Sequence, residues 1–173
     1  MSQPNTDIAL LIIDIQQGLF EKSTPIYMAK ELLENITGLA ERAHQAGATV
    51  FYVQHNDKKA LLRGSDGWQL HPQLKPFAGD LHIYKQHGSA FEETELADEL
   101  QKRGLKRLVV AGLVTHGCVK AACLDARKRG YPVILVKDAH SSFSKDAAHL
   151  IDEWNEKLSA EGVELKTAQE VEF

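Results

Sequence analysis

The stretch Ile8-Ala-Leu-Leu-Ile-Ile-Asp14 is a nearly continuous apolar run that ends in a carboxylate. Such a run is typical of a β-strand that is buried on both faces, as in the sheets of α/β proteins. A carboxylate that ends a buried strand is unfavourable unless it is solvated, paired or hydrogen-bonded. The run therefore predicts a strand covered on both sides, and it marks Asp14 as a residue whose surroundings matter.

Short β-type runs and helical patterns alternate along the rest of the chain. The further predicted strands are 48–53, 81–85, 107–112, 132–136 and 163–166, and the predicted helices are 27–45, 94–103, 117–129 and 145–160. Residues 56–76 are rich in Gly, Pro and charge without a clear period, which predicts a long surface excursion. The alternation predicts a three-layer, doubly wound α/β fold, in which helices cover both faces of a six-stranded, mostly parallel sheet. We expect a single domain over residues 1–173, because a chain of this length supports about one core.

The composition excludes several classes of protein. Apolar residues make up 43% of the 173 residues, charged residues make up 25%, and the formal net charge is −4. These values do not fit a disordered chain, and without a basic excess we expect no nucleic-acid partner. No apolar run near the start approaches the roughly 20 residues of a membrane span, and residues 1–7 lack the basic flank of a signal peptide. Two cysteines and no export signal predict a cytoplasmic protein without a membrane partner.

Polar residues at the predicted strand ends are the candidates for a site, since ligands of open α/β sheets bind beyond the carboxyl ends of the strands. The segment 112–118 has the Gly-x4-Gly layout of a phosphate-binding loop, but Cys118 and Val119 replace the required Lys and Ser/Thr. What remains is a tight loop that delivers Cys118 to the first turn of a helix. Backbone N–H groups and the helix dipole there predict a thiol pKa below the free value of about 8.5.

A different predicted strand ends at or shortly before each of three residues, Asp14, Lys85 and Cys118. Taken singly, Asp14 can cap a turn, Lys85 can be solvated, and a free cysteine is most often a buried structural residue, as we expect for Cys123. Taken together, an ammonium beside a thiol favours the thiolate, and a carboxylate can carry the proton. The combination therefore favours a nucleophilic cysteine.

Three ordered segments carry a resemblance to a known family: residues 10–20 (LLIIDIQQGLF), 85–91 (KQHGSAF) and 112–119 (GLVTHGCV). With them the chain resembles the isochorismatase-like cysteine hydrolase superfamily, which includes nicotinamidases and carbamoylsarcosine-type amidohydrolases, over nearly its whole length. The resemblance implies a catalytic triad of Asp14, Lys85 and Cys118. It also implies a cis peptide between Leu113 and Val114, with the backbone N–H groups of Val114 and Cys118 aimed at an oxyanion.

The implied reaction is hydrolysis of a C–N bond in a small-molecule amide through a thioester on Cys118, with Asp14 as the proton carrier. Residues 53–57 (VQHND) lack the carboxylate and histidine set with which nicotinamidases bind a divalent metal, so we expect no metal and no cofactor. Vinyl-ether hydrolysis of an isochorismate-like substrate stays open as an alternative, although Cys118 and a single candidate cation, Arg63, speak against it. The other alternative is a catalytically idle binding or scaffold protein.

Four residues near the motifs are predicted to bind substrate: Phe20, Trp68, His87 and His116. Members of the family commonly assemble as dimers or larger homo-oligomers, and the resemblance implies the same here. The excursion at 56–76, with Trp68 and Leu70, is the candidate interface and lid.

Overall fold

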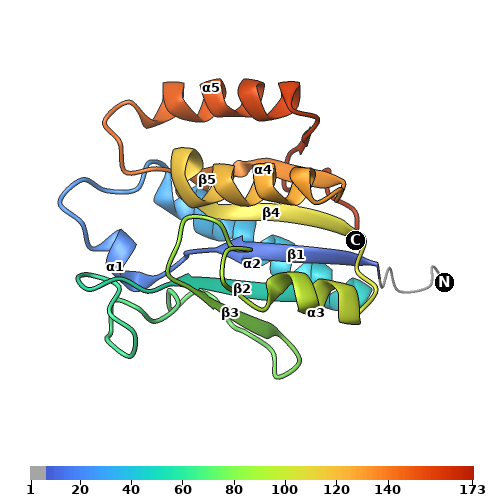
Figure 1. The fold of residues 1–173 in the computed structure, drawn as a ribbon. Coiled ribbons are helices and arrows are strands. Elements are labelled where there is room, and N and C mark those ends of the chain that lie inside the picture. The colour runs from blue at the N-terminus through green and yellow to red at the C-terminus, as the bar shows by residue number, and fades with distance from the viewer. Residues whose placement is uncertain (1–6) are drawn as a thin grey trace.

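The computed structural model describes residues 7–173 as a six-stranded parallel sheet with helices on both faces (Figure 1). Residues 1–6, on which the expectation of no signal peptide rests, lie outside the described part. The strands are β1 (Ile8–Ile13), β2 (Thr49–His55), β3 (Leu81–Lys85), β4 (Arg107–Leu113), β5 (Val133–Ser141) and β6 (Glu164–Lys166), in the order β3-β2-β1-β4-β5-β6. The doubly wound α/β class is confirmed, and each neighbouring pair of strands is parallel.

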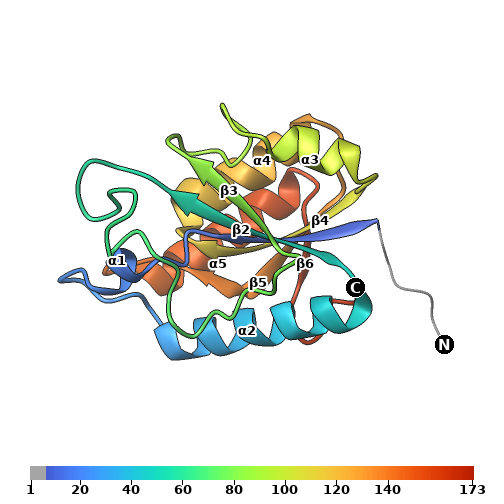
Figure 2. The same cartoon turned by 90° about the horizontal axis from the view of Figure 1, so that it is seen from below.

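Two apolar layers flank the sheet, and β1 contributes to both because its side chains alternate between the faces. Leu10 and Ile12 pack on one side, where the long helix α2 (Ala29–Ala46) lies. Ala9 and Leu11 pack on the other side. Figure 2 shows α2 below the sheet, with α3 (Leu96–Lys102) and α4 (Lys120–Lys128) above it. The remaining long helix, α5 (Ala147–Ala160), packs against α4, β5 and β6.

The register of the sheet brings several strand ends to one edge. Val53 of β2 and Gly112 of β4 both pair with Ile13, the last residue of β1, and His55 pairs with Lys85 at the end of β3. The residues that follow Ile13 and Leu113 therefore emerge beside His55 and Lys85. This is the edge at which the sequence predicts the site.

Gly112 allows β4 to run close against β1 at this edge. Its φ is +129°, and a Cβ at this position would lie 2.1 Å from the carbonyl oxygen of Ile13. The pairing of β4 with β5 also shifts its register between Val110 and Gly112. Glycine is needed here because other residues would clash with the backbone and would rarely adopt this φ.

The structure departs from the predicted elements in local ways. The strand predicted to end at 136 continues to Ser141, the short helix α1 (Gln17–Phe20) follows β1, and a π-helical turn, η1 (Thr115–Val119), precedes α4. The excursion after β2 contains no helix or strand among its described residues, and an isolated bridge joins Gln16 to Leu70. No helix within the described part of the chain combines the length and apolar character of a bilayer-spanning segment.

Candidate active site

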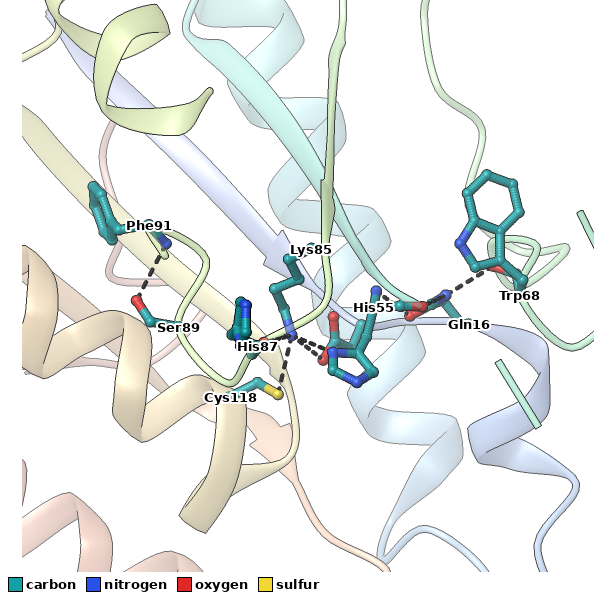
Figure 3. Close-up of polar contacts among 9 residues, drawn as sticks. Gln16, His55, Trp68, Lys85, His87, Ser89, Phe91 and Cys118 are labelled. Carbon is teal, nitrogen blue, oxygen red and sulfur yellow. Dashed lines mark hydrogen bonds and ion pairs between the residues drawn. The ribbon is translucent and has the colours of Figure 1, made fainter. Parts of the chain in front are cut away.

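Lys85 is the centre of the site. It ends β3 with a fully buried side chain, and its Nζ lies 3.1 Å from Asp14 Oδ2 and 3.2 Å from Cys118 Sγ. The same ammonium lies 3.0 Å from His55 Nδ1 and donates to the backbone oxygen of His87 at 3.1 Å (Figure 3). The three residues of the predicted triad are thus brought together by one buried cation.

Asp14 leaves β1 in a left-handed conformation, with φ at 53°, while its backbone N–H still donates to the carbonyl of Val53. The residue is 3% exposed, and its Oδ1 is a buried oxygen with no hydrogen-bond partner within residues 7–173. Burial raises the pKa of the Asp14 carboxyl, and the Lys85 ammonium opposes that rise. A carboxylate with a raised pKa and a free oxygen is suited to accept a proton.

Cys118 lies in η1, and Gly117 before it has non-helical backbone angles. The Leu113–Val114 peptide that leads into this turn is cis, and the carbonyl of Val114 accepts the N–H groups of Gly117 and Val119. This turn directs the Cys118 thiol toward Lys85 (Figure 3). A carboxylate oxygen of Asp14 lies within 4.8 Å of Cys118 Sγ.

The predicted lowering of the thiol pKa is wrong for the free protein. Burial raises the pKa of Cys118 to about 12, the Asp14 carboxylate adds to the rise, and the Lys85 ammonium only partly offsets it. The prediction rests on the helix end and the cation, whereas the desolvation of the thiol and the negative charge beside it depend on how the folded chain packs. Cys118 is therefore a neutral thiol next to a base in the resting site.

His55 is a site residue that the sequence argument did not assign. Burial, and next the Lys85 ammonium, lower the pKa of His55, so that a neutral ring presents Nδ1 as an acceptor to Lys85. Gln16 fixes the backbone of His55: its Oε1 accepts the N–H of His55, and its Nε2 donates to the carbonyls of His55 and Trp68. In the sequence, His55 is marked only by its position after an apolar run, and a single histidine at a strand end does not indicate a particular function.

Residues 7–173 contain one group of side chains whose donor atoms are close enough to bind a metal ion together. The group consists of Asp14, His55 and Cys118, with donor atoms within 4.8 Å of one another. The Lys85 ammonium lies within 3.2 Å of an atom of each of them. A divalent cation among these atoms would face this buried positive charge at close range, which is strongly unfavourable. The donor set therefore does not fit a metal while Lys85 is charged.

The four predicted substrate-binding residues lie at different places around the triad. The backbone carbonyl of His87 accepts from Lys85, whereas its ring is directed to Glu93, at 2.9 Å. The carbonyl of Trp68 accepts from Gln16, and Figure 3 shows its indole beyond Gln16, apart from the contact between Lys85 and Cys118. Phe20 packs its ring on His71, and His116 is exposed in η1. Within residues 7–173, neither Phe20 nor His116 makes a hydrogen bond or a ring contact to the triad.

The sequence and the fold of this chain are similar to those of known proteins. A family model described as the isochorismatase domain matches residues 8–164. Two streptothricin hydrolases from Streptomyces noursei are 29% and 30% identical over 168 residues, which are 95% of this chain and 61% and 67% of those proteins. Maleamate amidohydrolase from Pseudomonas putida is 28% identical over 149 residues, 75% of this chain and 70% of that protein. The crystal structure of an isochorismatase family protein has a TM-score of 0.89 at 27% identity and covers 93% of this chain and 98% of its own.

Proposed function

Because the chain belongs to the isochorismatase family, we propose that it is a metal-independent cysteine hydrolase that cleaves a C–N bond of a small amide. One observation carries the proposal: a single buried ammonium, that of Lys85, contacts both the Asp14 carboxylate and the Cys118 thiol. This is the arrangement of a nucleophile beside its base, with a cation that stabilises the charges formed when the proton moves. The similarity to a maleamate amidohydrolase, an enzyme named for a small amide, supports this substrate class.

In the first half of the proposed reaction, Cys118 Sγ attacks the amide carbonyl carbon while Asp14 takes the thiol proton. The negative charge that develops on the carbonyl oxygen is held by the backbone N–H groups of Val114 and Cys118. Asp14 then gives the proton to the amide nitrogen, the C–N bond breaks, and the amine leaves a thioester on Cys118. The Lys85 ammonium stabilises the negative charge that develops on the sulfur as its proton leaves, and afterwards the charge of the carboxylate.

In the second half, Asp14 removes a proton from water, and the resulting hydroxide attacks the thioester carbonyl. The C–S bond breaks, the carboxylic acid leaves, and the proton returns from Asp14 to the sulfur. The raised pKa of the thiol is consistent with this order of events, because the proton leaves sulfur only as the C–S bond forms. The neutral ring of His55 holds Lys85 through Nδ1 and needs no proton change in either half.

The test is a panel of small amides, with maleamate among them, assayed for released ammonia or amine with and without a chelator. The matched variants are Cys118→Ala and Cys123→Ala, because Cys123 is the other cysteine of the chain and is fully buried in α4. We expect turnover that survives chelation and Cys123→Ala and is lost in Cys118→Ala. Turnover that a chelator abolishes would contradict the metal-independent mechanism. Pyruvate release from a vinyl ether with no amide turnover would favour the other hydrolase class, and no turnover at all would favour an idle binding protein.

A further inference from the structure

A buried hydrogen-bonded chain outside the triad links the nucleophile turn to two other elements. Thr115 Oγ1, in η1, lies 2.8 Å from His140 Nδ1, and His140 Nε2, in β5, lies 2.8 Å from Asn155 Oδ1, in α5. Thr115 is 0% exposed and His140 is 3% exposed. No step of the proposed reaction uses these three side chains.

The chain has one consistent direction of hydrogen bonding. An amide oxygen only accepts, so His140 Nε2 carries the proton that is donated to Asn155. His140 Nδ1 is then the acceptor, and the Thr115 hydroxyl donates to it. Burial lowers the pKa of His140, while Asn155 and the Asp138 carboxylate act in the opposite direction, so the ring is held neutral in this tautomer.

Thr115 is placed where its orientation matters for the thiol. It is the first residue of η1, and it follows the cis peptide and precedes Cys118 by three positions. His140 pairs with Gly112 in the sheet, immediately beyond the register shift between β4 and β5. The hydrogen bond between Thr115 and His140 therefore ties the start of the turn to the part of β5 that pairs with β4.

We propose that His140 and Asn155 are positioning residues that act through Thr115 to hold Cys118 Sγ against Lys85 Nζ. The 3.2 Å contact between that sulfur and nitrogen depends on the path of the turn, since η1 includes a residue with non-helical angles, Gly117. Without the hydroxyl bond at Thr115, the turn loses its side-chain link to β5 and the thiol moves away from the ammonium. The inference goes beyond the proposed function, and it concerns the reactivity of Cys118 whatever the substrate is.

The experiment measures the second-order rate of Cys118 alkylation by iodoacetamide in the full chain, with peptide mass spectrometry and buried Cys123 as the internal reference. Thr115→Val removes the hydroxyl with little change of shape, and Thr115→Ser keeps it. His140→Asn keeps an acceptor near the position of Nδ1, whereas His140→Gln places its amide near Nε2 and keeps the link to Asn155. Each variant is also melted, so that the alkylation rate is compared at equal fractions of folded protein.

We expect Thr115→Val to slow alkylation by about tenfold and to move the pH profile upward by about one pH unit, because the thiolate loses stabilisation by Lys85. Thr115→Ser should restore the rate to within about twofold of the parent chain, and His140→Asn should react faster than His140→Gln. A parent-like rate in folded Thr115→Val would overturn the proposal. Equal slowing in both His140 variants, in proportion to their loss of thermal stability, would also overturn it and leave a purely structural role.

The result is separable from the fate of the proposed function. The ordering of alkylation rates requires no substrate, so it can hold even if the amide panel shows no turnover. Conversely, amide turnover by the parent chain together with a parent-like alkylation rate in Thr115→Val would leave the hydrolase proposal standing and remove the positioning role.

Discussion

Replacing Lys85 by Met is predicted to destabilise the protein strongly and in a pH-dependent way. Met approximates the length of the lysine stem but removes the ammonium, which leaves the Asp14 carboxylate buried without its cation. In the parent chain the two side chains are 0% and 4% exposed and their charged atoms are 3.1 Å apart. Breaking a buried ion pair by removing one partner typically lowers the free energy of unfolding by about 3–5 kcal/mol. We expect a loss of that size at pH 7.

The pH dependence follows from the direction of the Asp14 pKa. Burial already raises this pKa above its ordinary value of 3.8, and without Lys85 the rise is larger. A group whose pKa is raised in the folded state favours folding below its unfolded pKa, and this contribution is lost as pH rises through the folded pKa. The stability of Lys85→Met should therefore fall as pH increases above about 4, and the deficit relative to the parent chain should be smaller at low pH.

The assay is urea unfolding of the parent chain, Lys85→Met and the double variant Asp14→Asn/Lys85→Met at several pH values between about 4 and 8. The double variant removes the uncompensated charge, so we expect it to recover much of the loss at pH 7 and to show little pH dependence from this site. A loss of less than about 1 kcal/mol in Lys85→Met, or a double variant no more stable than the single one at pH 7, would show that Asp14 does not depend on Lys85 for its stability in the fold.

Three further predictions test other parts of the structure. Alkylation of Cys118 should rise about tenfold per pH unit between about pH 7 and 9, because its pKa is raised to about 12, and a plateau below pH 8 would contradict that value. Gln16→Ala removes three hydrogen bonds of a buried side chain and should lower the free energy of unfolding by about 3 kcal/mol. Gln54→Ala removes one and should lower it by about 1 kcal/mol. Equal losses for the two variants in denaturant titrations would argue against the hydrogen bonds of Gln16 to His55 and Trp68. Gly112→Ala should reduce the melting temperature sharply, because its Cβ would clash with the backbone of Ile13. Gly38→Ala should raise the free energy of unfolding by about 0.5–1 kcal/mol, because this position lies inside a helix and has open space for a Cβ. A Gly112→Ala variant with an unchanged melting temperature would contradict the close approach of β4 and β1.

The sheet, and the proximity of Asp14, Lys85 and Cys118, were predictable from the sequence because local patterns place all three residues at strand ends. A six-residue apolar run such as β1, fully buried in the structure, is strong evidence for a covered parallel strand. Once Asp14, Lys85 and the segment before Cys118 were assigned to different strand ends, the parallel topology alone brought them to one edge. The family suggested by the three motifs is confirmed by the match over residues 8–164.

Other features depend on packing that no local pattern encodes. The thiol pKa of Cys118 is determined mainly by how completely the fold excludes water from the site, and the position of Cys118 at a helix end does not show this. The extension of β5 past residue 136 includes Lys137 and Asp138, exposed polar residues that read as a turn. His55 gained its place only through the β2–β3 register and the hydrogen bonds of Gln16. The homo-oligomer, the interface at 56–76 and the cytoplasmic location stay predictions.

The proposed mechanism requires Cys118 to form a covalent bond to the acyl group of an amide. It is tested most directly by rapid acid quench of the protein during turnover, followed by intact-protein and peptide mass spectrometry. We expect an adduct with the mass of the acyl group on the peptide that contains Cys118. The adduct should be sensitive to hydroxylamine, as a thioester is, and absent in Cys118→Ala. Undiminished turnover in Cys118→Ala, or an acyl adduct on another residue, would contradict it.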